Sequence, residues 1–183
     1  MKRLLAIIIA CTLMMVPMQA QAKSVNRYAT KTTAIKEQAA RGAKAITKIK
    51  RNTRVKIVKE YKNWAMVECK GVTGYVAKSD LHATKSPKKY KGRKLRRSGV
   101  LRWKGYKFTW YSQRKLPGRG LNIPGRHVDK QGFVCDRDGY IVVASTRAMR
   151  KKRTIVPTPF GKYGKCYDCG AGSSRWRDCF VAW

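Results

Sequence analysis

Two aspartates near the C-terminus are the residues best suited to chemistry in this chain. Asp168 ends an alternating run over residues 165–168, and Asp178 opens another over residues 178–183, with a Gly-rich segment, 170–172, between them. The alternation predicts two strands joined by a loop. Neighbouring strands would bring both carboxylates to one rim, as acid/base chemistry on a sugar bond requires. The carboxylates could instead satisfy backbone N–H groups in turns, and the residues leave both interpretations open.

Residues 106–183 carry three segments with a family pattern: LPGRGLNIPGRHVDKQGFVCDRDGYIVVAS, TPFGKYGKCYDCG and the final RDCF. The combination resembles the three-aspartate domain, a family that includes membrane-bound lytic transglycosylase A. The resemblance implies a double-psi β-barrel that acts on peptidoglycan. Two positions depart from the family. Ala144 and Ser145 stand where the first of the three aspartates is expected, and Cys169 replaces the Thr of an Asp-Thr-Gly turn.

The resemblance implies lytic transglycosylation, with Asp168 as the acid that protonates the leaving oxygen. As a carboxylate, Asp168 would then accept the proton of the sugar's 6-hydroxyl, which replaces water as the nucleophile. Asp178 would hold Asp168 or the substrate. The residues of these motifs expected to bind substrate are Tyr167, Gly170, Thr158 and Gly161. No cofactor and no metal are expected. The competing hypothesis is a non-catalytic protein that binds peptidoglycan or teichoic acid, which the missing first aspartate favours.

Residues 1–22 have the pattern of a secretory signal peptide. Lys2 and Arg3 precede an apolar run over residues 4–16, and Ala20-Gln21-Ala22 provides small residues for cleavage. The apolar run is short for a membrane anchor. Lipidation at Cys11 is a less favoured alternative, because the apolar run continues past this residue. The pattern therefore predicts a secreted protein that is associated with the cell wall.

The chain is strongly basic, with 43 Lys and Arg, nine Asp and Glu, and a formal net charge of +34. Such an excess attracts polyanions, because bound cations release counterions and steer association. Outside a cell, the nearest polyanions are teichoic acids, wall carboxylates and anionic lipid. Nucleic acid is not an expected partner of a secreted protein, and the sequence does not indicate an oligomeric state.

Residues 23–84 are expected to form a first module of β hairpins, with alternating runs around a tight turn at Lys70-Gly71. Within it, WAMVECKGVTGYVAKSDL resembles the closing half of a bacterial Src-homology-3-like domain, which is a small β-barrel. Residues 34–42 differ from the family's Asn-Val-Arg-Ser-Gly-Pro-like stretch, so the resemblance does not extend to a ligand groove there. The simpler interpretation of Trp64 and Tyr75 is that they are core aromatics.

Residues 85–99 form a block of like charge with Pro and Gly, which predicts an extended basic linker. No Asp or Glu occurs between Leu81 and Val128. The linker is expected to tether the protein to anionic wall polymers or to a lipid surface. Residues 100–183 are then the second module, in which Asp138-Gly139 predicts a hairpin. The whole protein is expected to be mainly β, because no long segment after residue 22 has a helical period.

Five cysteines follow residue 22, so at least one of them cannot pair within the chain. The four at positions 135, 166, 169 and 179 could hold zinc, could include a disulfide, or could occupy strand positions by chance. The last interpretation is favoured, because a β-barrel of this size does not need a metal. His82 and His127 are the only histidines, which excludes a histidine-rich metal site.

Overall fold

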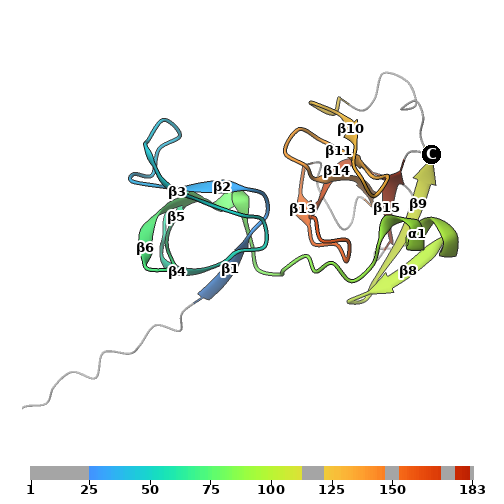
Figure 1. Ribbon diagram of the computed structural model, residues 1–183, viewed down its shortest axis with the longest axis horizontal. Helices are drawn as coiled ribbons and strands as arrows, with labels where there is room; N and C mark the ends of the chain where they lie inside the picture. Colours follow the sequence, from blue (N-terminus) through green and yellow to red (C-terminus); the bar gives the residue numbers. More distant parts are fainter. Residues whose placement is uncertain (1–24, 113–121, 147–152, 170–175, 182–183) are drawn as a thin grey trace, which may run out of the picture.

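The computed structural model describes residues 25–112, 122–146, 153–169 and 176–181, and these residues form two modules side by side (Figure 1). Strands dominate both modules, so the expectation of a mainly β protein is confirmed. The double-psi topology of the second module stays a prediction. The expected signal peptide, residues 1–22, lies outside the described residues, as does the expected substrate-binding residue Gly170.

The N-terminal module is a seven-stranded sheet with the order β3-β2-β6-β5-β4-β1-β7. Figure 1 shows these strands curling around an interior. The strands are β1 (Val25–Ala29), β2 (Thr33–Lys36), β3 (Ala45–Ile49), β4 (Arg54–Glu60), β5 (Trp64–Cys69), β6 (Val72–Ala77) and β7 (Leu81–His82), and the 3-10 helix η1 (Lys78–Asp80) precedes β7.

Alternation along β5 and β6 separates the core of this module from an outer face. Ala65 and Val67 are buried on one side of β5, and Trp64 on the other side is partly exposed. Lys70 and Gly71 both have positive φ, as the expected tight hairpin turn requires. In β6, a Cβ atom at Gly74 would lie 2.6 Å from the carbonyl oxygen of Lys36 in β2, so glycine permits these strands to approach.

The described part of the C-terminal module contains one short helix and an eight-stranded sheet. Its elements are α1 (Gly92–Ser98), β8 (Val100–Trp103), β9 (Tyr106–Ser112), β10 (His127–Val128), β11 (Val134–Cys135), β12 (Ile141–Ser145), β13 (Ile155–Val156), β14 (Gly164–Cys169) and β15 (Trp176–Val181). The main path is β10-β11-β12-β15-β9-β8, and β14 pairs with both β12 and β13.

Strand β12 is the centre of the second sheet. It runs parallel to β14 and antiparallel to β15 and β11. All five of its residues are buried, which fits a strand covered on both faces and explains its continuous apolar sequence. The expected hairpin around Asp138-Gly139 is present as the connection between β11 and β12.

The segment expected to be an extended linker is folded onto the second module, so that expectation was wrong for residues 86–98. The N–H of Lys89 donates to the carbonyl of Pro159 at 2.8 Å, and the N–H of Gly161 donates to that of Pro87 at 2.9 Å. Gly92–Ser98 is helical, and Leu95 is fully buried in the core formed with Phe108 and Phe133. Leu95, the partly buried Tyr90 and these backbone bonds anchor the segment, while most of its cations are exposed to solvent.

Polar contacts join the two modules. The Asn52 side chain donates to the carbonyl of Ser86 at 2.9 Å and accepts from its N–H at 3.0 Å. The Tyr163 hydroxyl donates to the carbonyl of Thr84 at 2.9 Å, and the hydroxyls of Thr30 and Tyr140 lie 2.6 Å apart in a buried position. These bonds fix the modules against one another, because buried polar groups retain their partners.

Candidate functional site

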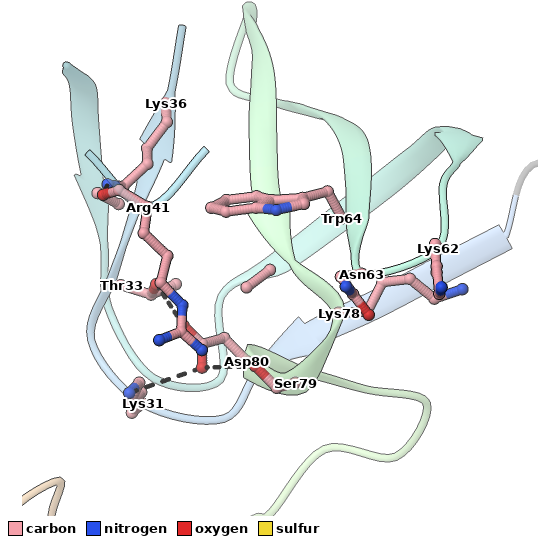
Figure 2. A pocket seen from close by; sticks show the side chains of 12 residues that line it. Lys31, Thr33, Lys36, Arg41, Lys62, Asn63, Trp64, Lys78, Ser79 and Asp80 are labelled. Carbon is pink, nitrogen blue, oxygen red and sulfur yellow. Dashed lines mark hydrogen bonds and ion pairs between the residues drawn. The ribbon is translucent and has the colours of Figure 1, made fainter. Parts of the chain in front are cut away.

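A pocket of about 610 Å3 lies on the outer face of the N-terminal module (Figure 2). It is bounded by β2, the turn after β2, the start of β5 and the end of β6. Its lining residues are Lys31, Thr33, Ala34, Lys36, Arg41, Lys62, Asn63, Trp64, Ala77, Lys78, Ser79 and Asp80. We call this site the Trp64 pocket, since the indole lies across it from Arg41 (Figure 2).

The Trp64 pocket is basic, with five Lys or Arg side chains and one carboxylate. Three of the cations are engaged. Lys31 Nζ lies 3.6 Å from Asp80, Lys78 Nζ donates to Glu60 at 2.8 Å, and Lys36 Nζ donates to the carbonyl of Ala43 at 3.2 Å. Among the described residues, Arg41 and Lys62 have no acidic partner. The pocket therefore offers positive charge to a ligand.

Trp64 contributes an accessible aromatic face to the pocket, so its interpretation as a core residue was wrong. Tyr75 is also partly exposed on the outer face, and its ring centroid lies 5.8 Å from that of Tyr61. A side-chain hydrogen bond with Tyr61 raises the pKa of Tyr75, and partial loss of solvent around the Tyr75 hydroxyl raises it further. Exposed aromatic rings beside cations suit ligands that combine an apolar face with carboxylates.

A chain of charged groups runs from the Trp64 pocket into the second module. Lys31 lies between Asp80 and Asp138, 3.6 and 3.4 Å from their nearer oxygens. Lys165 continues the chain, with its Nζ 3.8 Å from Asp138 and 3.0 Å from Asp136. Sequence reasoning missed this network, because its members are distant in the chain and only the folded hairpin 136–140 brings them together.

Asp136 is the most buried carboxylate of the network, with 1% exposure. Its Oδ1 accepts from the N–H groups of Asp138 and Tyr140, both at 3.0 Å. Its Oδ2 accepts from Lys165 at 3.0 Å and from the Tyr167 hydroxyl at 2.8 Å. The carboxylate therefore closes the turn and forms an ion pair with Lys165, which is a structural role.

The two aspartates expected to be catalytic occupy one row of the second sheet. Asp168 in β14 and Asp178 in β15 are both in register with Ala144 of β12, one on each side. The row continues from Asp178 to Thr109 of β9. Ala144 thus lies between the two aspartates in this row. Neighbouring Arg177 is buried, and its guanidinium carbon lies 3.5 Å from the Tyr106 ring centroid.

The other residues expected to bind substrate have structural roles where they are described. Thr158 is fully buried, and its hydroxyl donates to the carbonyl of Lys162 at 2.6 Å. Tyr167 is 8% exposed and bonded to Asp136, which leaves little surface for a ligand. Gly161 has a φ of 82° in a turn packed against Lys88. The hydroxyls of Thr158 and Tyr167 complete internal bonds. Substrate binding by these residues stays a prediction.

The described cysteines show no nucleophile. Cys69, Cys135 and Cys166 are buried and form no disulfide among the described residues. Burial raises the pKa of Cys135 to about 12, and nearby Lys162 only partly opposes this. A thiol with such a pKa is protonated at neutral pH and unreactive. Within the described part of the chain, no group of three His, Cys, Asp or Glu side chains is placed to hold a metal.

No helix among the described residues is both long and apolar enough to cross a membrane. Comparison with curated proteins finds no match, and comparison with solved structures finds none either. Residues 31–82 match the family model of the bacterial SH3 domain. This match includes the opening stretch 34–42, which lines the Trp64 pocket through Ala34, Lys36 and Arg41. The N-terminal module of this chain is therefore similar to a bacterial SH3 domain.

Proposed function

We propose that the protein binds peptidoglycan of the cell wall through the Trp64 pocket. The observation that carries the proposal is the pocket itself, in which an accessible indole lies across from Arg41 and to whose lining Lys62 also belongs. Bacterial SH3 domains often bind cell walls or peptidoglycan, and the pocket lies within residues 31–82 that match this family. The expected signal peptide supports the same location, because it would bring the protein to the wall.

The chemistry of the pocket fits the peptide part of peptidoglycan. Peptide stems carry free carboxylates, and Arg41 can donate hydrogen bonds to them from the planar fork of its N–H groups. The indole of Trp64 supplies a large apolar surface for a side chain or a sugar ring. Neither group forms a covalent bond with the ligand or transfers a proton to it, so the proposed role is retention at the wall.

Replacing Trp64 with alanine should weaken binding to purified peptidoglycan by about thirtyfold, as loss of a buried aromatic anchor typically does. The peptidoglycan should first be freed of teichoic acid, and binding measured by sedimentation against protein concentration. Tyr111→Ala is the matched control, because Tyr111 is an exposed aromatic of the other module. Equal binding by Trp64→Ala and the unmodified protein would refute the proposal.

A second candidate function is cleavage of the glycan strand, which the register of Asp168 and Asp178 about Ala144 favours. Digestion of peptidoglycan, followed by mass spectrometry, tests it. Anhydromuramyl products would identify lytic transglycosylation, and Asp168→Asn should then lower the rate at least about a hundredfold, because it abolishes proton transfer. Digestion that yields no new products would leave the protein as a binding protein.

A further inference from the structure

A second basic surface lies around helix α1, separate from the Trp64 pocket. Two grooves of about 320 and 600 Å3 flank the helix, and Lys91 and Arg93 line both of them. The other cations at the grooves are Lys88, Lys89, Lys94, Arg96, Arg97 and Lys130. We call these eight residues the α1 basic surface. It is a folded surface, since the segment that carries it is held to residues 159–161.

The α1 basic surface carries many more positive than negative side chains. Asp129 is the one carboxylate that lines either groove, and its Oδ2 lies 2.6 Å from Nζ of Lys162. Its Oδ1 accepts hydrogen bonds from the N–H groups of Gln131 and Phe133, so both oxygens of this carboxylate already have partners. In the described part of the chain, no carboxylate pairs with Lys91, Arg93 or Lys130. Like charges at this density repel one another, and an anionic ligand relieves the repulsion.

The helix arranges its cations on both sides of a ridge. Arg93 and Arg97 are four residues apart and line the smaller groove, whereas Arg93 and Arg96 are three apart and line the larger one. Leu95, between them in sequence, is buried and anchors the helix. A ligand that occupies both grooves would contact Lys91 and Arg93, because both residues line the two grooves. This arrangement suits a flexible chain with repeated anionic groups.

We propose that the α1 basic surface binds a polymer of phosphodiester groups. Each phosphodiester keeps a negative charge at all physiological pH values and presents several oxygens to cations that converge in one groove. Arginine recognises such groups through paired N–H donors. Among the described residues, Tyr90 is the one apolar side chain that lines either groove, and it is partly buried against the core. The surface therefore offers little of the apolar area by which a protein enters a lipid interface.

The test uses the purified protein, a poly(glycerol phosphate) chain, and titration at several salt concentrations. Binding should weaken steeply with salt, because each neutralised phosphate releases counterions. The double variant Lys91→Gln/Arg93→Gln should bind about tenfold to thirtyfold more weakly, with a shallower salt dependence. The control Lys48→Gln/Lys50→Gln removes the same charge at exposed residues outside both grooves. It should change binding less than about threefold.

Three results would overturn the proposal. Equal weakening in the two double variants would mean that net charge alone binds the polymer. Equal affinity for polyglutamate of the same length would remove the preference for phosphodiesters. Tighter binding to phosphatidylglycerol vesicles than to the polymer would assign the surface to a membrane. Because the probe contains no peptidoglycan, these results are independent of the Trp64→Ala experiment.

Discussion

The free energy of unfolding is expected to fall steeply above pH 10, by up to about 5 kcal/mol per pH unit. Burial raises the pKa values of Tyr140, Tyr163 and Tyr167 above their ordinary value of 10.0, and that of Cys135 from 9.0 to about 12. Above pH 10 the unfolded chain therefore loses up to four protons that the folded protein keeps. Stability from these groups is complete below pH 9 and is lost as pH rises, each proton contributing about 1.4 kcal/mol per unit.

Urea unfolding between pH 8 and pH 12 measures this loss. The variant Tyr140→Phe removes one of the four titrating groups, so its stability should fall with pH about one quarter less steeply. Loss of the hydrogen bond to Thr30 lowers the stability of this variant at every pH and does not change the slope. A slope equal to that of the unmodified protein would show that the Tyr140 hydroxyl is not kept protonated by burial.

The strands of this protein could be predicted from local sequence, because their signals are local. The tight turn Lys70-Gly71 and the hairpin at Asp138-Gly139 both appear where the sequence predicts them. The helix Gly92–Ser98 could not be predicted, since its seven residues contain one apolar side chain. Leu95 is decisive only because the folded second module offers it a core, and charge density alone suggested an extended linker.

The site was harder to predict than the fold, for reasons that differ between the modules. In the first module, comparison of residue types over residues 34–42 suggested no groove, although this stretch lies in the family match and lines the Trp64 pocket. In the second module, the polar residues of the YDCG motif suggested a substrate site. Tyr167 instead bonds to Asp136, a residue that lies 31 positions earlier and meets it only in the folded sheet.

Replacing Asp136 with alanine is expected to lower the free energy of unfolding by about 3–5 kcal/mol, the usual cost of removing one partner from a buried ion pair. The change would remove the acceptor of Lys165, of the Tyr167 hydroxyl and of two backbone N–H groups, all of which now donate to this carboxylate. Asp136→Asn keeps acceptor capacity for the turn but loses the charge, so its loss should be smaller. Urea unfolding followed by tryptophan fluorescence measures both variants.

Asp138→Ala is the matched control for Asp136, because the two aspartates share Lys165 as a partner but differ in burial. The Asp138 side chain is 33% exposed, and among the described residues it forms ion pairs of 3.4 and 3.8 Å, so its removal should cost less than about 1 kcal/mol. Since Asp138 is also the link to Lys31 at the Trp64 pocket, its loss should free the modules from one ionic contact without unfolding either. Equal destabilisation by Asp136→Ala and Asp138→Ala would show that the turn, and not burial of the Asp136 charge, determines the stability of the network.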